Sequence, residues 1–266
     1  MNNNTNENTA YNKMELMVCA AARELQDNST VIIGTGVPCA AGMLAQKTHA
    51  PNLVLFFEAG GAGPQLPTMP VSVGDSRTTQ RAIMATTMLD VMEMAQRGLV
   101  DFCFIGGAQI DRYGNINSTM IGSDYTHPKV RFPGSGGAND LASLCKKTLV
   151  VTNHDRKRFV QKIDFVTTPG YLDGPNTARS REAVGLPRGT GPYKVITDLA
   201  IMDYEEKSFC MRVISLHPGV TAAQVQENTA FELLFAENIQ QTAIPTSQEL
   251  HILREEIDPL RYVIGR

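Results

Sequence analysis

The sequence lacks the features that would place the protein in a membrane, outside the cell or on a nucleic acid. Its 266 residues include five cysteines, and no two of them form a CxxC pair. Thiols scattered in this way, several of them in apolar segments, are typical of a reducing compartment, and we expect a cytoplasmic location. The formal net charge is −3, so no basic surplus indicates a nucleic acid or an anionic membrane as partner. No uncharged apolar run reaches the ~18 residues of a membrane span.

The start of the chain lacks the basic and apolar regions of a signal peptide. Residues 1–12 are mostly polar, and we expect them to form a flexible tail. The remainder, 13–266, contains no internal repeat and no linker rich in proline, glycine and serine. It is long enough to bury a substantial core. These features predict a single domain over 13–266.

Several catalytic motifs are also missing. The five histidines show neither HxxxH nor HExxH spacing, so we predict no metal site. The glycines around Ser135 do not form the GxSxG pattern of a nucleophile elbow, and there is no Walker A loop. A dinucleotide-binding loop beginning at Gly34 and Gly36 would need a third glycine where the sequence has Cys39. That loop could still present backbone N–H groups to an anionic or carbonyl ligand.

The chain does contain a repeated unit, in which a short apolar run is followed by a glycine-rich turn and a helical pattern. The predicted strands are 30–33, 52–57, 100–105 and 148–152, and the predicted helices are 13–25, 39–47, 79–97 and a short one from residue 141. Such repeats predict an α/β fold with a mostly parallel open sheet and helices on both faces.

The pattern changes after residue 154. Residues 169–192 are rich in glycine and proline and predict a long irregular segment. Residues 194–202 and 209–215 predict two strands of a hairpin. Short helices are predicted at 221–227 and 247–257, and Pro259 ends the second.

Glu58 is the candidate reactive residue. It follows the apolar run 52–57 directly and precedes Gly60, Gly61 and Gly63. Glycines at these positions allow positive φ and a close approach of a ligand to the backbone. Ligands of open α/β sheets bind beyond the carboxyl ends of the strands, which is where this order places the carboxylate. The alternative is a solvated glutamate beside a flexible turn.

The missing motifs leave the glycine loops as sources of backbone donors, with Glu58 as the reactive side chain among them. A carboxylate that attacks a thioester or an anhydride needs donors that stabilise the developing oxyanion. We expect the loop at Gly136 and Gly137, continuing into Ala138, to supply them. Gln109 and Asn117 are candidate contacts to a substrate, or amides that only stabilise a turn.

Seven segments, in this order along the chain, resemble the β subunit of family I coenzyme A transferases, and most of all its glutaconate CoA-transferase branch. These segments are Leu55–Gly60, Phe104–Asn117, Gly134–Asp140, Ile163–Pro169, Ile196–Ile201, Leu216–Thr221 and Arg254–Pro259. The resemblance extends from about Met14 to the end of the chain. It departs mildly from the family at Ala59, where asparagine or serine is usual.

The resemblance implies a transferase in which Glu58 is the nucleophile. Glu58 would attack an acyl-CoA, and CoA would return to give a glutamyl-CoA thioester that an acceptor acid resolves in a ping-pong reaction. Gly34, Gly36, Gly60, Gly61, Gln109 and Asn117 are then the expected contacts to substrate or CoA. Coenzyme A is a substrate, and no permanently bound cofactor is expected.

The resemblance also implies a partner. Family members combine this β subunit with a second kind of chain, the α subunit; the site lies between the two, and their heterodimers associate further. The partner would largely choose the acyl group, for which the glutaconate likeness favours a dicarboxylic or otherwise polar acid. Two alternatives stay open. One is an acyl-CoA hydrolase or decarboxylase on the same scaffold, and the other is a non-catalytic ligand-sensing module, since sugar-phosphate isomerases and some transcriptional sensors share this general fold.

Overall fold

The helices match the helical patterns of the sequence in most places. The computed structural model describes residues 10–265. Its helical segments are α1 (Lys13–Arg23), α2 (Val37–Lys47), a 3₁₀ turn (Ser76–Thr79), α3 (Met88–Gln96), α4 (Ala138–Leu144), α5 (Ala222–Glu227), α6 (Ser247–His251) and a π-helical segment (Ile252–Ile257). Asn12 begins α1 with a capping box, in which its side chain and Glu15 each accept a backbone N–H of the other.

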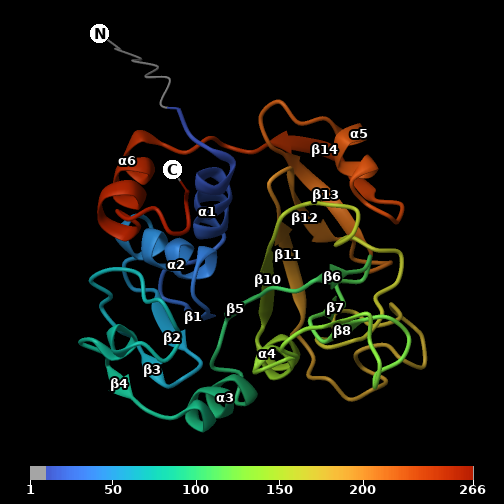
Figure 1. Ribbon diagram of the computed structural model, residues 1–266, viewed down its shortest axis with the longest axis horizontal. Coiled ribbons are helices and arrows are strands. Elements are labelled where there is room, and N and C mark those ends of the chain that lie inside the picture. The colour runs from blue at the N-terminus through green and yellow to red at the C-terminus, as the bar shows by residue number, and fades with distance from the viewer. Residues whose placement is uncertain (1–9, 266) are drawn as a thin grey trace.

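Ten strands form one sheet, and four short strands form two small hairpins (Figure 1). The sheet contains β1 (Thr30–Ile33), β2 (Val54–Phe57), β3 (Gly61–Ala62), β4 (Met84–Ala85), β5 (Phe102–Ile105), β10 (Lys147–Val151), β11 (Pro192–Ile196), β12 (Ala200–Tyr204), β13 (Met211–Leu216) and β14 (Leu234–Gln241). The hairpins pair β6 (Gln109–Ile110) with β7 (Ile116–Asn117) and β8 (Met120–Ile121) with β9 (Val130–Arg131).

The centre of the large sheet is parallel. Its strand order is β14-β13-β12-β11-β10-β5-β1-β2-β3-β4, and all neighbours from β2 to β11 pair in parallel. Antiparallel pairing occurs on either side of this centre, where β3 and β4 follow β2 and where β12 lies between β11 and β13. The prediction of a mostly parallel open sheet is confirmed.

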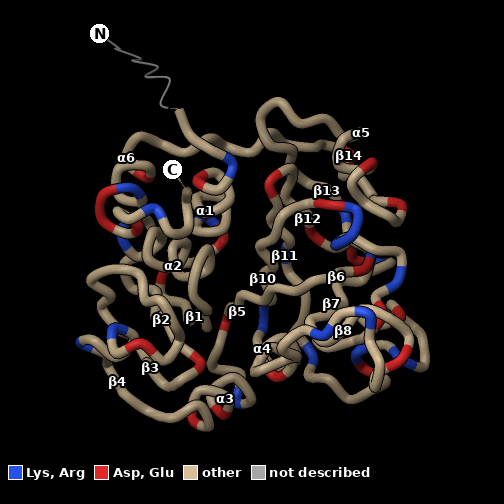
Figure 2. The backbone as a smooth tube through the Cα atoms, viewed as in Figure 1, with Lys and Arg blue, Asp and Glu red and all other residues tan. Residues whose placement is uncertain are grey.

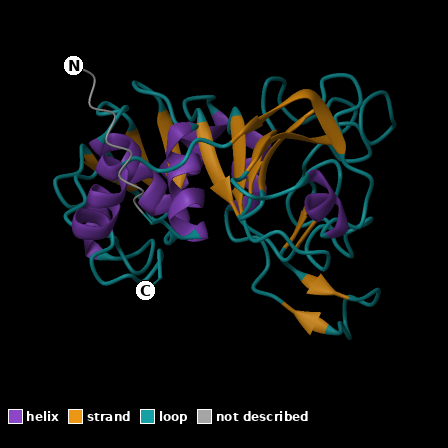
Figure 3. Ribbon diagram, turned by 90° about the horizontal axis from the view of Figure 1, so that it is seen from above, coloured by secondary structure: helices purple, strands orange, loops and turns teal. Residues whose placement is uncertain are grey.

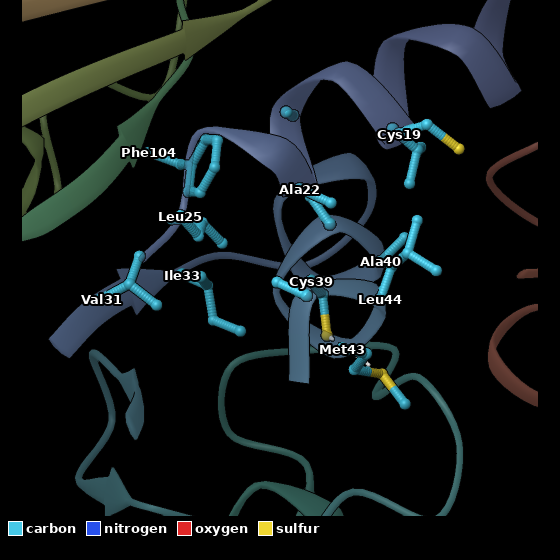
Figure 4. Close-up of a cluster of buried hydrophobic side chains, with 14 of the residues drawn as sticks. Cys19, Ala22, Leu25, Val31, Ile33, Cys39, Ala40, Met43, Leu44 and Phe104 are labelled. Atoms are coloured by element: carbon cyan, nitrogen blue, oxygen red, sulfur yellow. Dashed lines mark hydrogen bonds between the residues drawn. The ribbon is translucent and has the colours of Figure 1, made fainter. Parts of the chain in front are cut away.

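Helices cover both faces of the sheet, as predicted. Successive side chains of a strand point to opposite faces, so each central strand contributes apolar side chains to a core on either side. In β1, Val31 and Ile33 belong to one core cluster and Ile32 to the other. The first cluster packs β1 against α1 and α2, and Figure 4 shows Cys19, Cys39 and other small or flexible side chains filling it. The second cluster includes buried residues of α3 and α4. Figure 3 shows most of the helices gathered beside one end of the sheet.

The helix predicted at 79–97 is wrong in its first half. α3 begins only at Met88, because Thr87 and Asp90 form a capping box there. The preceding Met84 and Ala85 pair with Ala62 and Gly61 as β4. The apolar residues Ile83 and Met84, which suggested a longer helix, lie on an exposed edge and are 80% and 39% exposed.

Two predictions in the second half of the chain need correction. The run 194–202 is two strands, because the Thr197 hydroxyl accepts the N–H groups of Leu199 and Ala200 and turns the chain between β11 and β12. The hairpin predicted between this run and 209–215 is confirmed as the antiparallel β12–β13 pair. The helix predicted at 247–257 changes from α to π geometry at Ile252.

The flexible tail predicted at 1–12 stays a prediction, and contacts with the rest of the chain are described only for its last residues. Residues 1–9 lie outside the described residues. The Asn12 side chain donates to the carbonyl of Ile264 over 2.8 Å, and Arg254 donates to the carbonyl of Ala10 over 2.7 Å. Residues 10–12 therefore join the two ends of the described chain.

Basic residues and acidic residues are interspersed along the backbone, as Figure 2 shows. This distribution agrees with the small net charge of −3. Between residues 10 and 265, no helix has the length and apolar character that a bilayer crossing requires.

Candidate active site

The carboxyl ends of three adjacent parallel strands carry Glu58, Gly34 and Gly106, which follow β2, β1 and β5 directly. The crossover from β1 to β2 runs through α2 on one face of the sheet, whereas the connection from β2 to β5 contains α3 on the other face. A crevice forms where successive connections change face in this way.

A cavity of about 150 Å³ occupies this crevice. Glu58, Gly34 and Gly106 line it from the strand ends, and residues 135–138 line it from the loop before α4. Its other lining residues are Ile32, Ile33, Val73, Phe104, Ile105 and Leu141. Of all these lining residues Glu58 alone carries a charge, and Ser135 is the one other residue with a polar side chain. The rest of the described lining is glycine or apolar.

Gly137 meets Glu58 directly. Its backbone N–H donates to Oε1 of Glu58 over 3.1 Å. A Cβ atom at position 137 would lie 2.8 Å from that same oxygen and 2.5 Å from Cε of Met92. Only glycine therefore leaves room for the carboxylate and the amide to come this close. The arrangement places a fixed N–H donor on an oxygen of the candidate nucleophile.

The predicted glycines fall into two groups. Gly34, Gly136 and Gly137, together with Ala138, line the cavity with Glu58. Gly60 and Gly61 lie outside its lining and serve the turn after β2. A Cβ atom at Gly60 would collide with the carbonyl of Thr86, and one at Gly61 with the carbonyl of Thr78.

Gly36 is also outside the lining of the cavity. It is the N-cap residue of α2 and has a φ of 77°, a value that favours glycine. Its place at the entry to the helix accounts for a glycine there without a bound ligand.

The two predicted amides bind each other. Nδ2 of Asn117 donates to Oε1 of Gln109 over 2.7 Å and to the carbonyl of Met120 over 2.6 Å. The Asn117 side chain is fully buried, and Gln109 is 7% exposed. Gln109 also accepts the N–H of Asp164 over 2.9 Å. Neither side chain lines the cavity, so the geometry favours the alternative in which both amides stabilise turns.

Ser118 is a residue that the sequence did not single out. Its Oγ donates to the carbonyl of Gly134 over 2.9 Å, and its own carbonyl accepts the Gly134 N–H over 3.0 Å. Ser118 thus holds the loop that carries Gly137. Its only sequence signal is its position directly after Asn117, at the end of a segment that resembles the family.

Residues 10–265 contain no group of three or more histidine, cysteine, aspartate or glutamate side chains that could hold a metal ion. The five cysteines are free, four of them buried and Cys210 half-buried.

A comparison with family models matches residues 14–228 to the coenzyme A transferase family. The chain is 42% identical over 247 residues to the β subunit of 3-oxoadipate CoA-transferase of Pseudomonas knackmussii, covering 92% of this chain and 93% of the relative. It is 37% identical over 256 residues to the β subunit of glutaconate CoA-transferase of Acidaminococcus fermentans, covering 94% of each.

Solved structures agree with these relatives. The fold matches the crystal structure of glutaconate coenzyme A-transferase from Acidaminococcus fermentans with a TM-score of 0.90 and 35% identity, over 97% of this chain and 99% of that one. It also matches the decarboxylase AibA/AibB with a TM-score of 0.82 and 25% identity, over 97% and 100% of the two chains. The chain therefore belongs to the coenzyme A transferase family, as its sequence predicted.

Proposed function

We propose that this chain is the β subunit of a heteromeric CoA-transferase that moves CoA from an acyl-CoA to a free carboxylic acid through a thioester on Glu58. The hydrogen bond between the Gly137 N–H and Oε1 of Glu58 carries the proposal. It combines the only charged side chain in the lining of the cavity, a carboxylate, with a backbone donor aimed at the oxygen where charge would develop.

The first half of the reaction transfers the acyl group. Glu58 attacks the thioester carbonyl through one carboxylate oxygen, the C–S bond breaks, and CoA leaves as a thiolate. The product is an anhydride between the acyl group and Glu58. Carboxylates are weak nucleophiles toward thioesters, so the preorganised main-chain donors of the glycine loop have to lower the barrier.

The second half places CoA on the enzyme. The thiolate attacks the Glu58 carbonyl of the anhydride, and the original acid leaves as a carboxylate. During this attack the negative charge develops on the Glu58 oxygen that stays bound to its Cδ. The Gly137 N–H already points at a Glu58 oxygen and would stabilise that oxyanion, an effect worth about 3–4 kcal/mol per donor in acyl-transfer enzymes. An acceptor acid then repeats the steps in reverse.

The partner α subunit completes the site in this proposal. The cavity of about 150 Å³ offers no cationic side chain for a substrate carboxylate or for the phosphates of CoA. Next to it, the turn after Glu58 packs against residues 86–87, beside an apolar edge where Ile83 is 80% and Leu89 75% exposed. An exposed apolar surface of this kind marks a contact with another protein. We infer that the α subunit covers this edge and supplies the missing polar groups.

The relatives suggest a class of substrate. The names of both curated relatives, a 3-oxoadipate and a glutaconate CoA-transferase, contain a dicarboxylate. We propose that this enzyme likewise acts on a dicarboxylic or otherwise polar acid, with its second carboxylate bound by the α subunit. The cytoplasmic location stays a prediction.

Trapping the intermediate tests the function. The chain is co-expressed with its α subunit, the complex is incubated with an acyl-CoA, and borohydride or hydroxylamine is added before peptide mapping by mass spectrometry. We expect modification confined to Glu58, no modification in Glu58→Ala, and transfer of CoA to a second acid.

The same assay separates the alternatives. Free acid formed at the full rate without an acceptor would indicate a hydrolase, and release of carbon dioxide would indicate a decarboxylase, the activity named for AibA/AibB. Absence of both labelling and turnover, with retained binding of a small ligand, would indicate a sensing module. Any of these three results would contradict the proposed transfer.

A further inference from the structure

Ser118 contacts the glycine loop at Gly134. The residue lies between β7 and β8 in the chain, and it contacts Gly134, three residues before the N-cap residue Gly137 of α4. Its two oxygen atoms bind the amide hydrogen and the carbonyl of Gly134, over 3.0 and 2.9 Å. Gly134 and Gly136 have φ values of 98° and 49°. Glycines in this region have many accessible conformations, so the loop depends on outside contacts to hold one of them.

Ser118 is itself firmly held. Its N–H donates to Oγ1 of Thr167 over 2.9 Å. The buried Asn117 side chain accepts the N–H groups of Thr119 and Met120 over 3.0 and 3.3 Å and closes the turn that contains Ser118. The hydroxyl groups of Thr119 and Thr167 lie 2.7 Å apart and add a further link.

The other end of the loop is anchored to the same residue, Thr167. Asn139, in the first turn of α4, donates from its side chain to the carbonyl of Thr167 over 2.9 Å. Thr167 therefore supports both Ser118 and the start of the helix. Between these two anchors lies Gly137, whose N–H meets Glu58.

We propose that Ser118 is a positioning residue for CoA transfer, which fixes the Gly134–Gly137 loop so that the Gly137 N–H stays aligned with the Glu58 carboxylate. This inference rests on the proposed function. Ser118 does not line the cavity, so it acts on the reaction through Gly134. Asn117 and Gln109 then act indirectly, because their hydrogen bonds hold the turn that contains Ser118.

Loss of the hydroxyl has a defined expected effect. In Ser118→Ala the Gly134 carbonyl loses a donor, while the Gly134 N–H keeps its main-chain acceptor. The loop should then sample positions in which the Gly137 N–H is displaced. A displacement of about 1 Å at a reacting group costs about 100-fold in rate, so we expect kcat to fall between 10- and 100-fold. KM should stay within about twofold, because no group that touches substrate is removed.

The experiment uses the complex with the α subunit and three variants. Ser118→Ala removes the hydroxyl, Ser118→Thr keeps one, and Ser123→Ala removes an exposed hydroxyl on the same stretch of chain. For each we measure kcat, KM, the rate at which hydroxylamine-sensitive label appears on Glu58, and amide hydrogen exchange of the peptide around 132–140. We expect slower labelling and faster exchange in Ser118→Ala, recovery in Ser118→Thr, and no change in Ser123→Ala.

Two results would overturn the proposal. Equal kcat in Ser118→Ala and the wild type would show that the loop needs no hydroxyl. If kcat of Ser118→Ala fell only in proportion to a lower unfolding temperature, without faster amide exchange in the loop, the role of Ser118 would be purely structural. Failure of the wild type itself to transfer CoA would contradict the proposed function instead, and the exchange measurement would still report whether Ser118 orders the loop.

Discussion

Arg254 joins the last helical segment of the described chain to the first helix through Glu15. Its Nε lies 2.6 Å from Oε1 and its Nη2 2.8 Å from Oε2 of that carboxylate. Glu15 is 1% exposed. Burial alone would raise the pKa of Glu15, but the Arg254 guanidinium and the Asn12 N–H outweigh it and lower the pKa overall. A carboxylate this deeply buried stays charged only because its partner is present.

Removal of Arg254 should therefore destabilise the protein. We expect Arg254→Ala to lower the free energy of unfolding by about 2–3 kcal/mol, because one buried charge loses its partner while the arginine itself was partly solvated. Lys47→Ala is the matched control. This substitution breaks the ion pair between Lys47 and Glu256, whose two side chains are 38% and 45% exposed. It should lower the free energy of unfolding by less than about 0.5 kcal/mol. Equal losses in urea-induced unfolding of the two variants would contradict this account.

His154 should make stability depend on pH. It is buried, its ring nitrogens lie 3.1 and 2.8 Å from the hydroxyls of Thr197 and Thr229, and it stacks on Phe159. Burial lowers its pKa from 6.5 to about 4, although Asp198 and Asp155 act in the opposite direction. The unfolded chain then binds a proton below pH 6.5 that the folded chain rejects. Stability should fall as the pH falls from 6.5 toward 4, by at most about 3 kcal/mol.

A comparison of variants isolates this contribution, because Asp111 acts oppositely. Burial raises the pKa of Asp111 from 3.8 to about 6, so its contribution is lost as the pH rises through that range. We expect His154→Gln to be less stable at pH 7 and to lose less stability on acidification than the wild type. His127→Gln, at a side chain that is 86% exposed, should follow the wild type. Parallel pH curves for His154→Gln and the wild type would rule the prediction out.

The central strands could be predicted because each is a short apolar run buried on both faces, and β1 has the bounds that its sequence indicates. The start of α3 could not be found from apolar spacing. A capping box at Thr87 decides it, while the apolar residues before it lie on an exposed edge. The spacing of apolar residues favours a longer helix, but Met84 instead pairs with Ala62 in the sheet.

The candidate site could be predicted only in part, for a similar reason. Glu58 stands out because a carboxylate follows a buried strand, and the glycines at 136 and 137 stand out as a loop. The contact between Glu58 and Gly137 spans 79 residues. Ser118 carries no chemical signature of its own, and its role becomes visible only when β8 and the loop are placed together. Gln109 and Asn117 resembled substrate contacts because buried amides look the same in a sequence whether they bind a ligand or a turn.

Gly137→Ala should impair transfer without unfolding the protein. The added methyl group would meet both Met92 and Glu58, at 2.5 and 2.8 Å. The flexible Met92 side chain can move, so the loss in stability should stay near 1 kcal/mol. The carboxylate would be pushed from its donor, and kcat should fall about 100-fold. Gly74→Ala, where the new Cβ meets no atom within 4 Å, is the control.

A second substitution separates the two contacts. Met92→Ala should relieve the crowding in Gly137→Ala and recover stability, whereas kcat should stay low because the methyl group still faces Oε1 of Glu58. Full recovery of kcat in the double variant would mean that crowding by Met92, and not the donor to Glu58, limits the reaction.

Glu58→Asp tests whether the position of the carboxylate matters as much as its charge. Aspartate keeps the negative charge and the ability to form an anhydride, but it withdraws both oxygens by one methylene from a donor that lies 3.1 Å away in the wild type. A shift of this size should lower kcat at least about 100-fold, while label from acyl-CoA still accumulates slowly at position 58. Glu58→Gln should show no label and no transfer, because its amide cannot attack the thioester. Transfer by Glu58→Gln with both substrates bound together would show that CoA moves directly between the acids and that Glu58 is not a covalent intermediate.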